Sequence, residues 1–178
     1  MQTEFCKQLG VDAPIFAFTH CRDVVVAVSK AGGIGVLGAV GFSPEQLKEE
    51  LDWIDEHIGD HIYGVDTAIP QKYEGMDKTT PEDLVAMLQA AIPEQHRKFV
   101  DRLLTDAGVP PWPNPEDGIT LSFSAIQAQA LVDEALTRPK CRMIVNALGT
   151  PPAEVIDQVH ESGRLIGALA GRIKHGVA

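Results

Sequence analysis

The chain has 178 residues, of which 44% are hydrophobic and 22% charged, a composition typical of a folded globular domain rather than of a disordered segment. Its formal net charge of −10 disfavours nucleic acid or an anionic membrane surface as a partner, because such partners attract an excess of Lys and Arg. Length and composition together favour a single domain.

No segment has the features of a leader or a membrane anchor. The opening residues, MQTEFCKQLG, are mixed and polar, and no apolar run approaches the roughly 18 residues that span a bilayer. Cys6, Cys21 and Cys141 are scattered, without CxxC or Cys/His spacing, so we expect neither a disulfide framework nor a zinc site. These features predict a cytoplasmic protein with reduced cysteines.

The N-terminal part of the chain alternates between apolar runs of strand length and amphipathic helices. Strands are expected at 13–18, 34–39 and 62–66, and helices at 23–31 and 44–58. Ser43-Pro44 is a strong helix start, because Ser is a favoured N-cap and Pro a favoured first helical residue. Apolar strands separated by helices are typical of a parallel sheet covered by helices.

The alternation is interrupted between residues 70 and 120, which we interpret as a helical insertion. Helices are expected there at 80–91 and 93–107, followed by a proline-rich segment, 109–115, that cannot be helical because its prolines lack N–H donors. The alternation resumes with a helix at 124–136, a strand at 141–146, a helix at 151–163 and a strand at 165–169.

The sequence therefore predicts an α/β fold with about five parallel strands, although the alternation alone does not separate a closed barrel from an open doubly wound sheet. A closed (β/α)₈ barrel needs eight strands and typically about 250 residues. Five strands leave an exposed hydrogen-bonding edge. We therefore expect that the chain is part of a longer protein or that it pairs with a second copy of itself.

Residues 33–38, GIGVLG, match the GxGxxG pattern of dinucleotide-binding loops. The functional motif requires the glycines to follow a strand and to open a helix. Here the expected order is reversed, because the glycines follow a helix and run into a strand. Helix termination and tight packing of the helix on the strand explain these glycines better.

The carboxyl ends of the expected strands hold the candidate ligand-binding residues, since ligands of parallel α/β proteins bind there. Asp66 and Asn146 end two apolar strands, where they would bind a ligand or satisfy local backbone groups. His20 is a candidate for proton transfer near neutral pH. An exposed or helix-capping histidine is the favoured alternative, because nothing in the sequence supplies an orienting partner. No metal site is expected from the histidine spacings.

Three stretches carry a resemblance to a known family. They are APIFAFTHCRDVVVAVSKAGGIGVLGA, IYGVDTAIP and IVNALGTPPAEVIDQVHESGRLIGALAG, within a similarity that covers residues 3–68 and 120–178. Together they resemble the nitronate monooxygenase (2-nitropropane dioxygenase) family. The AVSxAGGxG run is also found in flavin-dependent enoyl reductases, which are relatives of that family.

The resemblance implies a (β/α)₈ barrel of the TIM type that binds FMN and oxidises nitronates or nitroalkanes with dioxygen. The residues that it implies for the flavin site are Ala17, Phe18 and Thr19, through their backbone atoms, together with Asp66, Asn146 and Ala168. Asp66 stands where many family members carry Asn. The family's proton-abstracting histidine follows the next strand, beyond Ala178, so His20 is only a weak catalytic candidate.

Two hypotheses from different classes follow. In the first, the chain is the N-terminal portion, or a shortened form, of an FMN-dependent nitronate monooxygenase acting on a small-molecule substrate. In the second, it is a non-catalytic half-barrel that self-associates as a homodimer and binds flavin weakly or not at all. Neither nucleic acid nor a membrane is an expected partner.

Overall fold

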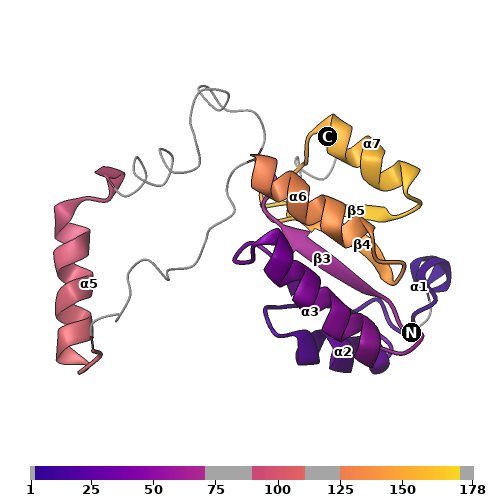
Figure 1. Ribbon diagram of the computed structural model, residues 1–178, viewed down its shortest axis with the longest axis horizontal. Helices are drawn as coiled ribbons and strands as arrows, with labels where there is room; N and C mark the ends of the chain where they lie inside the picture. The colour runs from indigo at the N-terminus through magenta and orange to yellow at the C-terminus, as the bar shows by residue number, and fades with distance from the viewer. Residues whose placement is uncertain (1–2, 71–89, 111–124, 173–178) are drawn as a thin grey trace. The chain divides into compact units, whose positions relative to one another are not determined.

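The computed structural model describes residues 3–70, 90–110 and 125–172 (Figure 1). The elements alternate between helix and strand as the sequence predicts. They are α1 (Glu4–Leu9), β1 (Phe16–Thr19), α2 (Arg22–Lys30), β2 (Ile34–Gly38), α3 (Pro44–His57), β3 (Tyr63–Thr67), α5 (Glu94–Asp106), α6 (Ala125–Leu136), β4 (Cys141–Asn146), α7 (Ala153–Glu161) and β5 (Leu165–Ala168). Most of the helix expected at 80–91 and most of the proline-rich segment lie outside the described residues.

The strands form one sheet in the order β1-β2-β3-β4-β5, and every neighbouring pair is parallel. Each new strand is therefore added on the same side of the one before it. An open doubly wound sheet instead reverses its strand order at a switch point. The sequential order is the arrangement of a segment of a (β/α) barrel, which confirms the predicted fold class.

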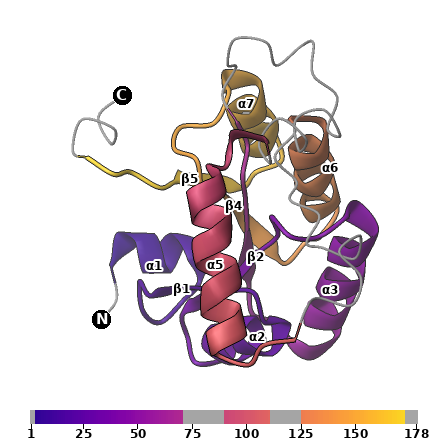
Figure 2. The ribbon, with the colours of Figure 1, turned by 90° about the vertical axis from the view of Figure 1, so that its left-hand side faces the viewer.

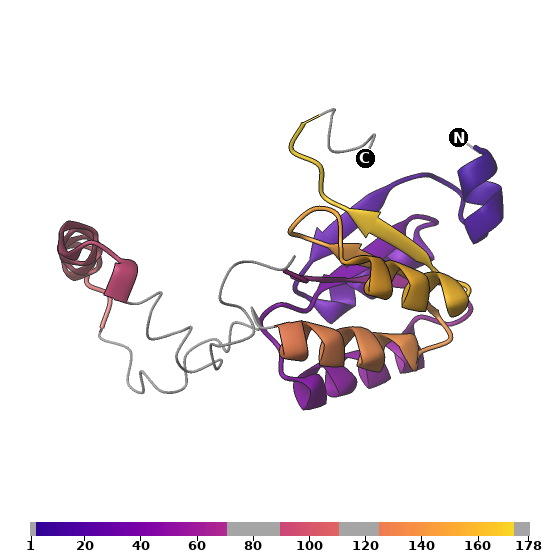
Figure 3. The same cartoon turned by 90° about the horizontal axis from the view of Figure 1, so that it is seen from above.

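One face of the sheet is covered by α2, α3, α6 and α7, and we call it the helical face. The helices bury apolar stripes against one of the two alternating sets of strand residues, which includes Leu37, Val65 and Ile144. The buried helix residues in this core are Val25, Val26, Leu47, Leu51, Ile54, Ala128, Leu131, Val132, Ala135, Val155 and Val159. Seen from above, α3 and α6 lie together beneath the sheet (Figure 3).

The opposite face, which we call the inner face, packs against α1 at the amino ends of the strands. Cys6 of α1 joins Val11, Ile34, Val36 and Met143 in a second, smaller core. In Figure 2, α1 lies on one side of the sheet and α3 and α6 lie on the other. The sequence analysis missed this helix, which is capped by Thr3 at its start and by a left-handed glycine at its end.

Within the GIGVLG run, Gly35 serves helix–strand packing, as the sequence predicts. A Cβ atom at Gly35 would lie 2.4 Å from the carbonyl oxygen of Val25 on α2. Only glycine allows this close approach of helix and strand. The run follows α2 and forms β2, so it does not open a helix at which a pyrophosphate would bind.

The chain divides into two compact units, one formed by residues 1–72 and 120–178 and the other by residues 73–119. The described part of the second unit contains α5, which begins after Pro93 and ends before Gly108, a glycine with φ of 67°. Both ends agree with the expected helix. Among the described residues, no helix is long and apolar enough to cross a membrane.

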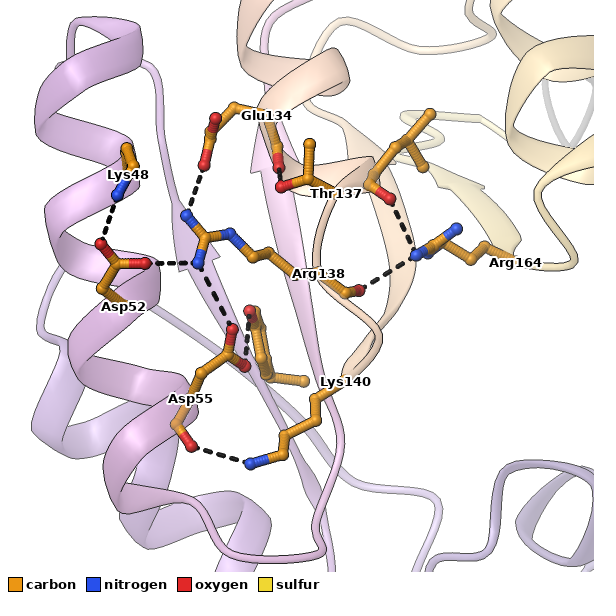
Figure 4. Close-up of polar contacts among 10 residues, drawn as sticks. Lys48, Asp52, Asp55, Glu134, Thr137, Arg138, Lys140 and Arg164 are labelled. Atoms are coloured by element: carbon orange, nitrogen blue, oxygen red, sulfur yellow. Dashed lines mark hydrogen bonds and ion pairs between the residues drawn. The ribbon is translucent and has the colours of Figure 1, made fainter.

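A charged network ties α3 to the segment between α6 and β4 at the amino ends of the strands (Figure 4). The side chain of Arg138 is 14% exposed, and its guanidinium contacts Asp52, Asp55 at 3.7 Å and Glu134 at 2.5 Å. Lys140 donates to the backbone oxygen of Asp55 at 2.7 Å. The carboxylates of Asp52 and Asp55 therefore neutralise a mostly buried cation.

Arg164, immediately before β5, ties the same region to the next strand. Its guanidinium donates to the backbone oxygens of Leu136 at 2.9 Å, Arg138 at 3.0 Å and Cys141 at 2.7 Å. Two of these carbonyls belong to the end of α6 and the loop after it, where backbone acceptors lack partners within the helix. The side chain therefore closes the end of α6 against β4.

Replacing Arg138 with Gln should lower the free energy of unfolding by about 1–3 kcal/mol at pH 7, because three carboxylates lose one shared, mostly buried cation. Chemical denaturation measures the change. Lys48→Gln is the matched control, since it removes only an exposed pair with Asp52 and should have little effect. Equal effects of the two substitutions would contradict a central role for Arg138.

Candidate functional site

The carboxyl ends of the strands bring a small group of side chains together on the inner face. Side chains alternate between the two faces of a strand, and residues in register share a face. Phe18 pairs with Val36, which belongs to the inner core. Gly38 lies two residues after Val36 in β2 and therefore faces the same way. Its partner in β3 is Asp66, which is thus also on the inner face. The partner of Asp66 in β4 is Val145.

His20 lies over Gly38 at this end of the inner face. Its Nδ1 atom is 3.1 Å from the carbonyl oxygen of Gly38. A Cβ atom at position 38 would lie 2.7 Å from Cε1 of His20 and 2.7 Å from the ring of Phe18. The rings of Phe18 and His20 meet edge to face, with centroids 5.1 Å apart. The imidazole thus occupies the space that the missing side chain of Gly38 leaves.

Asp66 is a buried acid without a hydrogen-bond partner at one oxygen. The residue is 4% exposed, and among the described residues nothing bonds to its Oδ1 atom. Burial raises the pKa of the carboxyl group to about 6, and the charge of His20 acts in the opposite direction. A buried polar atom without a partner is costly and marks a place where a ligand would supply the missing donor.

Asn146 is on the opposite, helical face and is fully buried. Its Oδ1 atom accepts from the backbone N–H groups of Ile69 at 2.8 Å and Leu148 at 3.3 Å. Its Nδ2 atom donates to the carbonyl oxygens of Ile69 at 3.0 Å and Gly149 at 2.8 Å. The amide therefore joins the segments that follow β3 and β4, which is the alternative role that the sequence left open.

The other residues suggested for a flavin also point to the helical face. By the alternation of β1 and β5, the side chains of Ala17, Thr19 and Ala168 lie opposite to that of Phe18. The hydroxyl of Thr19 accepts from the backbone N–H of Cys21 at 3.0 Å. The backbone contacts of Ala17 and Thr19 with a flavin, and the contact of Ala168, which the resemblance implies, stay predictions.

Of the residues singled out from the sequence, Phe18, His20 and Asp66 come together. Sequence reasoning missed Gly38, which holds the histidine in place. The sequence does contain a signal for this contact. Gly38 ends one expected strand, and His20 comes directly after Phe18 and Thr19 at the end of the strand before it. Within the described ranges, no group of three or more His, Cys, Asp or Glu side chains is placed to hold a metal ion.

Comparisons with known proteins bear on the fold and on the sequence of the chain. No protein-family profile matches the chain. The chain is 43% identical over 178 residues to a protein of Mycobacterium tuberculosis named "Putative monooxygenase Rv1533", and the match covers 98% of this chain and 47% of the relative. The chain thus spans about half the length of that relative.

Solved structures show the same fold at lower sequence identity. A mutant of FabK from Thermotoga maritima matches with a TM-score of 0.59 and 17% identity, over 98% of this chain and 41% of the FabK chain. Nitroalkane oxidase from Streptomyces ansochromogenes matches with a TM-score of 0.59 and 19% identity, over 97% of this chain and 44% of the oxidase. These matches confirm the α/β arrangement.

Asp66→Asn should stabilise the protein at neutral pH. Because the folded-state pKa of Asp66 is raised from 3.8 to about 6, the folded protein binds this proton more tightly, and its stability falls as the pH rises through that window. At pH 7.5 the amide should raise the free energy of unfolding by about 1–3 kcal/mol, and near pH 4 the two proteins should be similar.

Denaturation at both pH values measures this difference. Asp157→Asn, at an exposed position of α7, is the matched control and should be neutral at both. A variant Asp66→Asn that is less stable than the wild type at pH 7.5 would show that the ionised carboxylate is well solvated or paired, against the geometry described above.

Proposed function

We propose that the chain forms part of an FMN-dependent oxidoreductase that oxidises nitronates or nitroalkanes with dioxygen. The observation that carries the proposal is the 43% identity, across 98% of the chain, to a protein named as a monooxygenase. A nitroalkane oxidase has the same fold, and at 19% identity this match supports the fold of the proposed enzyme and not its substrate. The resemblance of residues 13–39, 62–70 and 144–171 to nitronate monooxygenases points the same way.

The inner face fits a flavin at the carboxyl ends of the strands. The unpartnered Oδ1 atom of Asp66 needs a donor, and a flavin offers an N–H group on its ring and hydroxyl groups on its ribityl chain. Phe18 and Val145 provide apolar surface on the same face, of the kind that lines cofactor sites. Asp66 would therefore hold the polar edge of the cofactor while its neighbours contact the ring.

A bound flavin would supply the electron acceptor and the chemistry with dioxygen. The residues of this chain would bind and orient the reactants. Phe18, which is 58% exposed, would shield the reacting atoms from water once a ligand covers it. The backbone of β1 at Ala17 and Thr19 would contact the cofactor. Asn146 would hold the loops after β3 and β4 in place through its hydrogen bonds to Ile69 and Gly149.

A second candidate function is a non-catalytic module that associates with another copy of itself. The edge strand β1 and the residue before it favour this alternative, because Ile15, Phe16 and Phe18 are exposed apolar side chains. Contiguous exposed apolar surface commonly marks an interface. The two candidates differ in one property that is easily measured, namely whether the protein retains a flavin.

The test is to incubate the purified protein with FMN, separate it by gel filtration and record the spectrum. We expect flavin absorbance near ~450 nm to travel with the protein, since a formed pocket buries most of its cofactor. Phe18→Asp, which places a charge on the inner face, should weaken FMN binding by at least ~10-fold. Val24→Asp is the control, because Val24 is exposed on α2.

A colourless protein that elutes as a dimer would contradict the enzymatic proposal and favour self-association. Equal loss of FMN from both variants would contradict the placement of the cofactor on the inner face.

A further inference from the structure

We propose that Asp66 couples ligand binding on the inner face to the release of a proton, so that the site binds its ligand more tightly when this acid is ionised. The identity of the ligand, a flavin, rests on the proposed function. The coupling itself rests on the burial of Asp66, on its unpartnered oxygen and on the uncharged residues beside it in the sheet. It concerns the binding of the cofactor and not the oxidation of a substrate.

The free protein gives the Asp66 carboxylate little support. The residue is 4% exposed, and within the described ranges its Oδ1 atom has no hydrogen-bond partner. An ionised carboxylate in such a place lacks both water and hydrogen-bond donors, which are the groups that stabilise its charge. The protonated acid is therefore favoured in the free protein, and burial raises the pKa of the carboxyl group from 3.8 to about 6.

The elements packed around Asp66 add little charge. Its register partners are Gly38 of β2, which has no side chain, and Val145 of β4, which is apolar. The segment after β1 places His20 over Gly38, and the charge of His20 acts to lower the pKa of Asp66. This effect is smaller than that of burial, and no other charge in the described part of the chain acts on the carboxyl group. A donor for the ionised acid therefore has to come from a ligand.

Asp55 shows what donors do for a partly buried acid in the same protein. Burial raises the pKa of Asp55 as well. Its carboxylate, however, accepts from the hydroxyl of Tyr63 at 3.3 Å and lies 3.7 Å from the guanidinium of Arg138, and both contacts act to lower the pKa. The folded chain thus supplies Asp55 with the donors that Asp66 lacks.

Two other side chains in the described ranges have a buried polar atom without a partner, and neither can couple binding to a proton. Thr67 follows Asp66 in β3, but its hydroxyl does not titrate near neutral pH. The Nε atom of Arg138 is unpartnered, yet the guanidinium stays charged and its other nitrogens bind carboxylates. Asp66 is the one of the three whose missing partner changes its protonation.

A ligand that donates a hydrogen bond to Oδ1 of Asp66 would favour the ionised form and lower the pKa of the acid in the complex. The N–H group of a flavin ring or a hydroxyl of its ribityl chain is such a donor. Coupling between two binding events is reciprocal, so the ligand binds more tightly to the ionised acid by the same factor. Below pH 6 the acid then has to lose its proton on binding, and the affinity falls as the pH falls.

The opposite sign is the alternative. A ligand that covers Asp66 without donating to it would remove the remaining access to water and raise the pKa further. Binding would then take up a proton, and the affinity would rise as the pH falls. The direction of the pH dependence therefore distinguishes a donor at Oδ1 from a ligand that only covers the acid.

The test is to titrate the purified wild type and Asp66→Asn with FMN at pH 5 and pH 7.5 and to follow the flavin fluorescence. The phosphate of FMN also titrates in this range, but it contributes equally to both proteins. We expect the dissociation constant of the wild type, divided by that of Asp66→Asn, to be about 10-fold higher at pH 5, because an acid with a pKa of about 6 is then mostly protonated.

Two further variants separate Asp66 from other titrating groups. Histidine side chains titrate near neutral pH, so a dependence caused by His20 would disappear in His20→Gln and survive in Asp66→Asn. We expect the reverse. Asp157→Asn removes an exposed acid of α7 and should show the same pH dependence as the wild type.

A second readout counts the proton directly. Calorimetric titration with FMN at pH 6, in two buffers with different ionisation enthalpies, gives the number of protons released for each ligand bound. Because Asp66 is about half protonated at this pH, the wild type should release about 0.5 proton more than Asp66→Asn. The amide has nearly the same shape as the acid and carries no charge, so the variant should fold.

An affinity ratio that changes in the opposite direction, a net uptake of protons relative to Asp66→Asn, or equal pH dependence of the two proteins would each overturn the proposal. These outcomes differ from failure of the proposed function. A protein that binds FMN with the same pH dependence as Asp66→Asn would keep the flavoprotein and contradict the coupling. A protein that binds no FMN at either pH would contradict both.

Discussion

The structure depends on one constraint, which is that α2, α3, α6 and α7 all cover the same face of a sequentially ordered parallel sheet. A parallel sheet needs apolar cover on both faces. The second face therefore has to be filled in another way. In the described residues α1 fills it only at the amino ends of the strands, around Cys6, and the carboxyl ends retain exposed apolar and unpartnered polar groups such as Phe18 and Asp66.

Stability and the candidate function are thus divided between the two ends of the strands. At the amino ends, Arg138 and Arg164 bind carboxylates and backbone carbonyls around the end of α6, although the Nε atom of Arg138 is buried without a partner. At the carboxyl ends, an acid is buried without a partner beside an oriented imidazole. Proteins accept such local cost mainly where a ligand or a reaction needs it. The same division between a stabilising and a ligand-binding end is general among (β/α) barrels.

The sequence predicts the repeated elements well because their signals are local. The capping box at Ser43 and the apolar stripe after it define α3 without reference to the rest of the chain. The six-residue α1 is missed because it is short and polar, and is held by Cys6 in a distant core. The contact of His20 with Gly38 could not be predicted either, since Gly38 is 18 residues away and is brought there by the pairing of β1 with β2.

The central claim is that the carboxyl end of the inner face is the ligand-binding surface. The most direct measurement is to add FMN to isotope-labelled protein and to map the shifted backbone amide resonances. The account predicts that the largest changes fall on Phe18, His20 and Asp66, with little change at Cys6, at the amino end of the same face. Changes centred on the outer surfaces of α2 and α3, with none at Asp66, would contradict it.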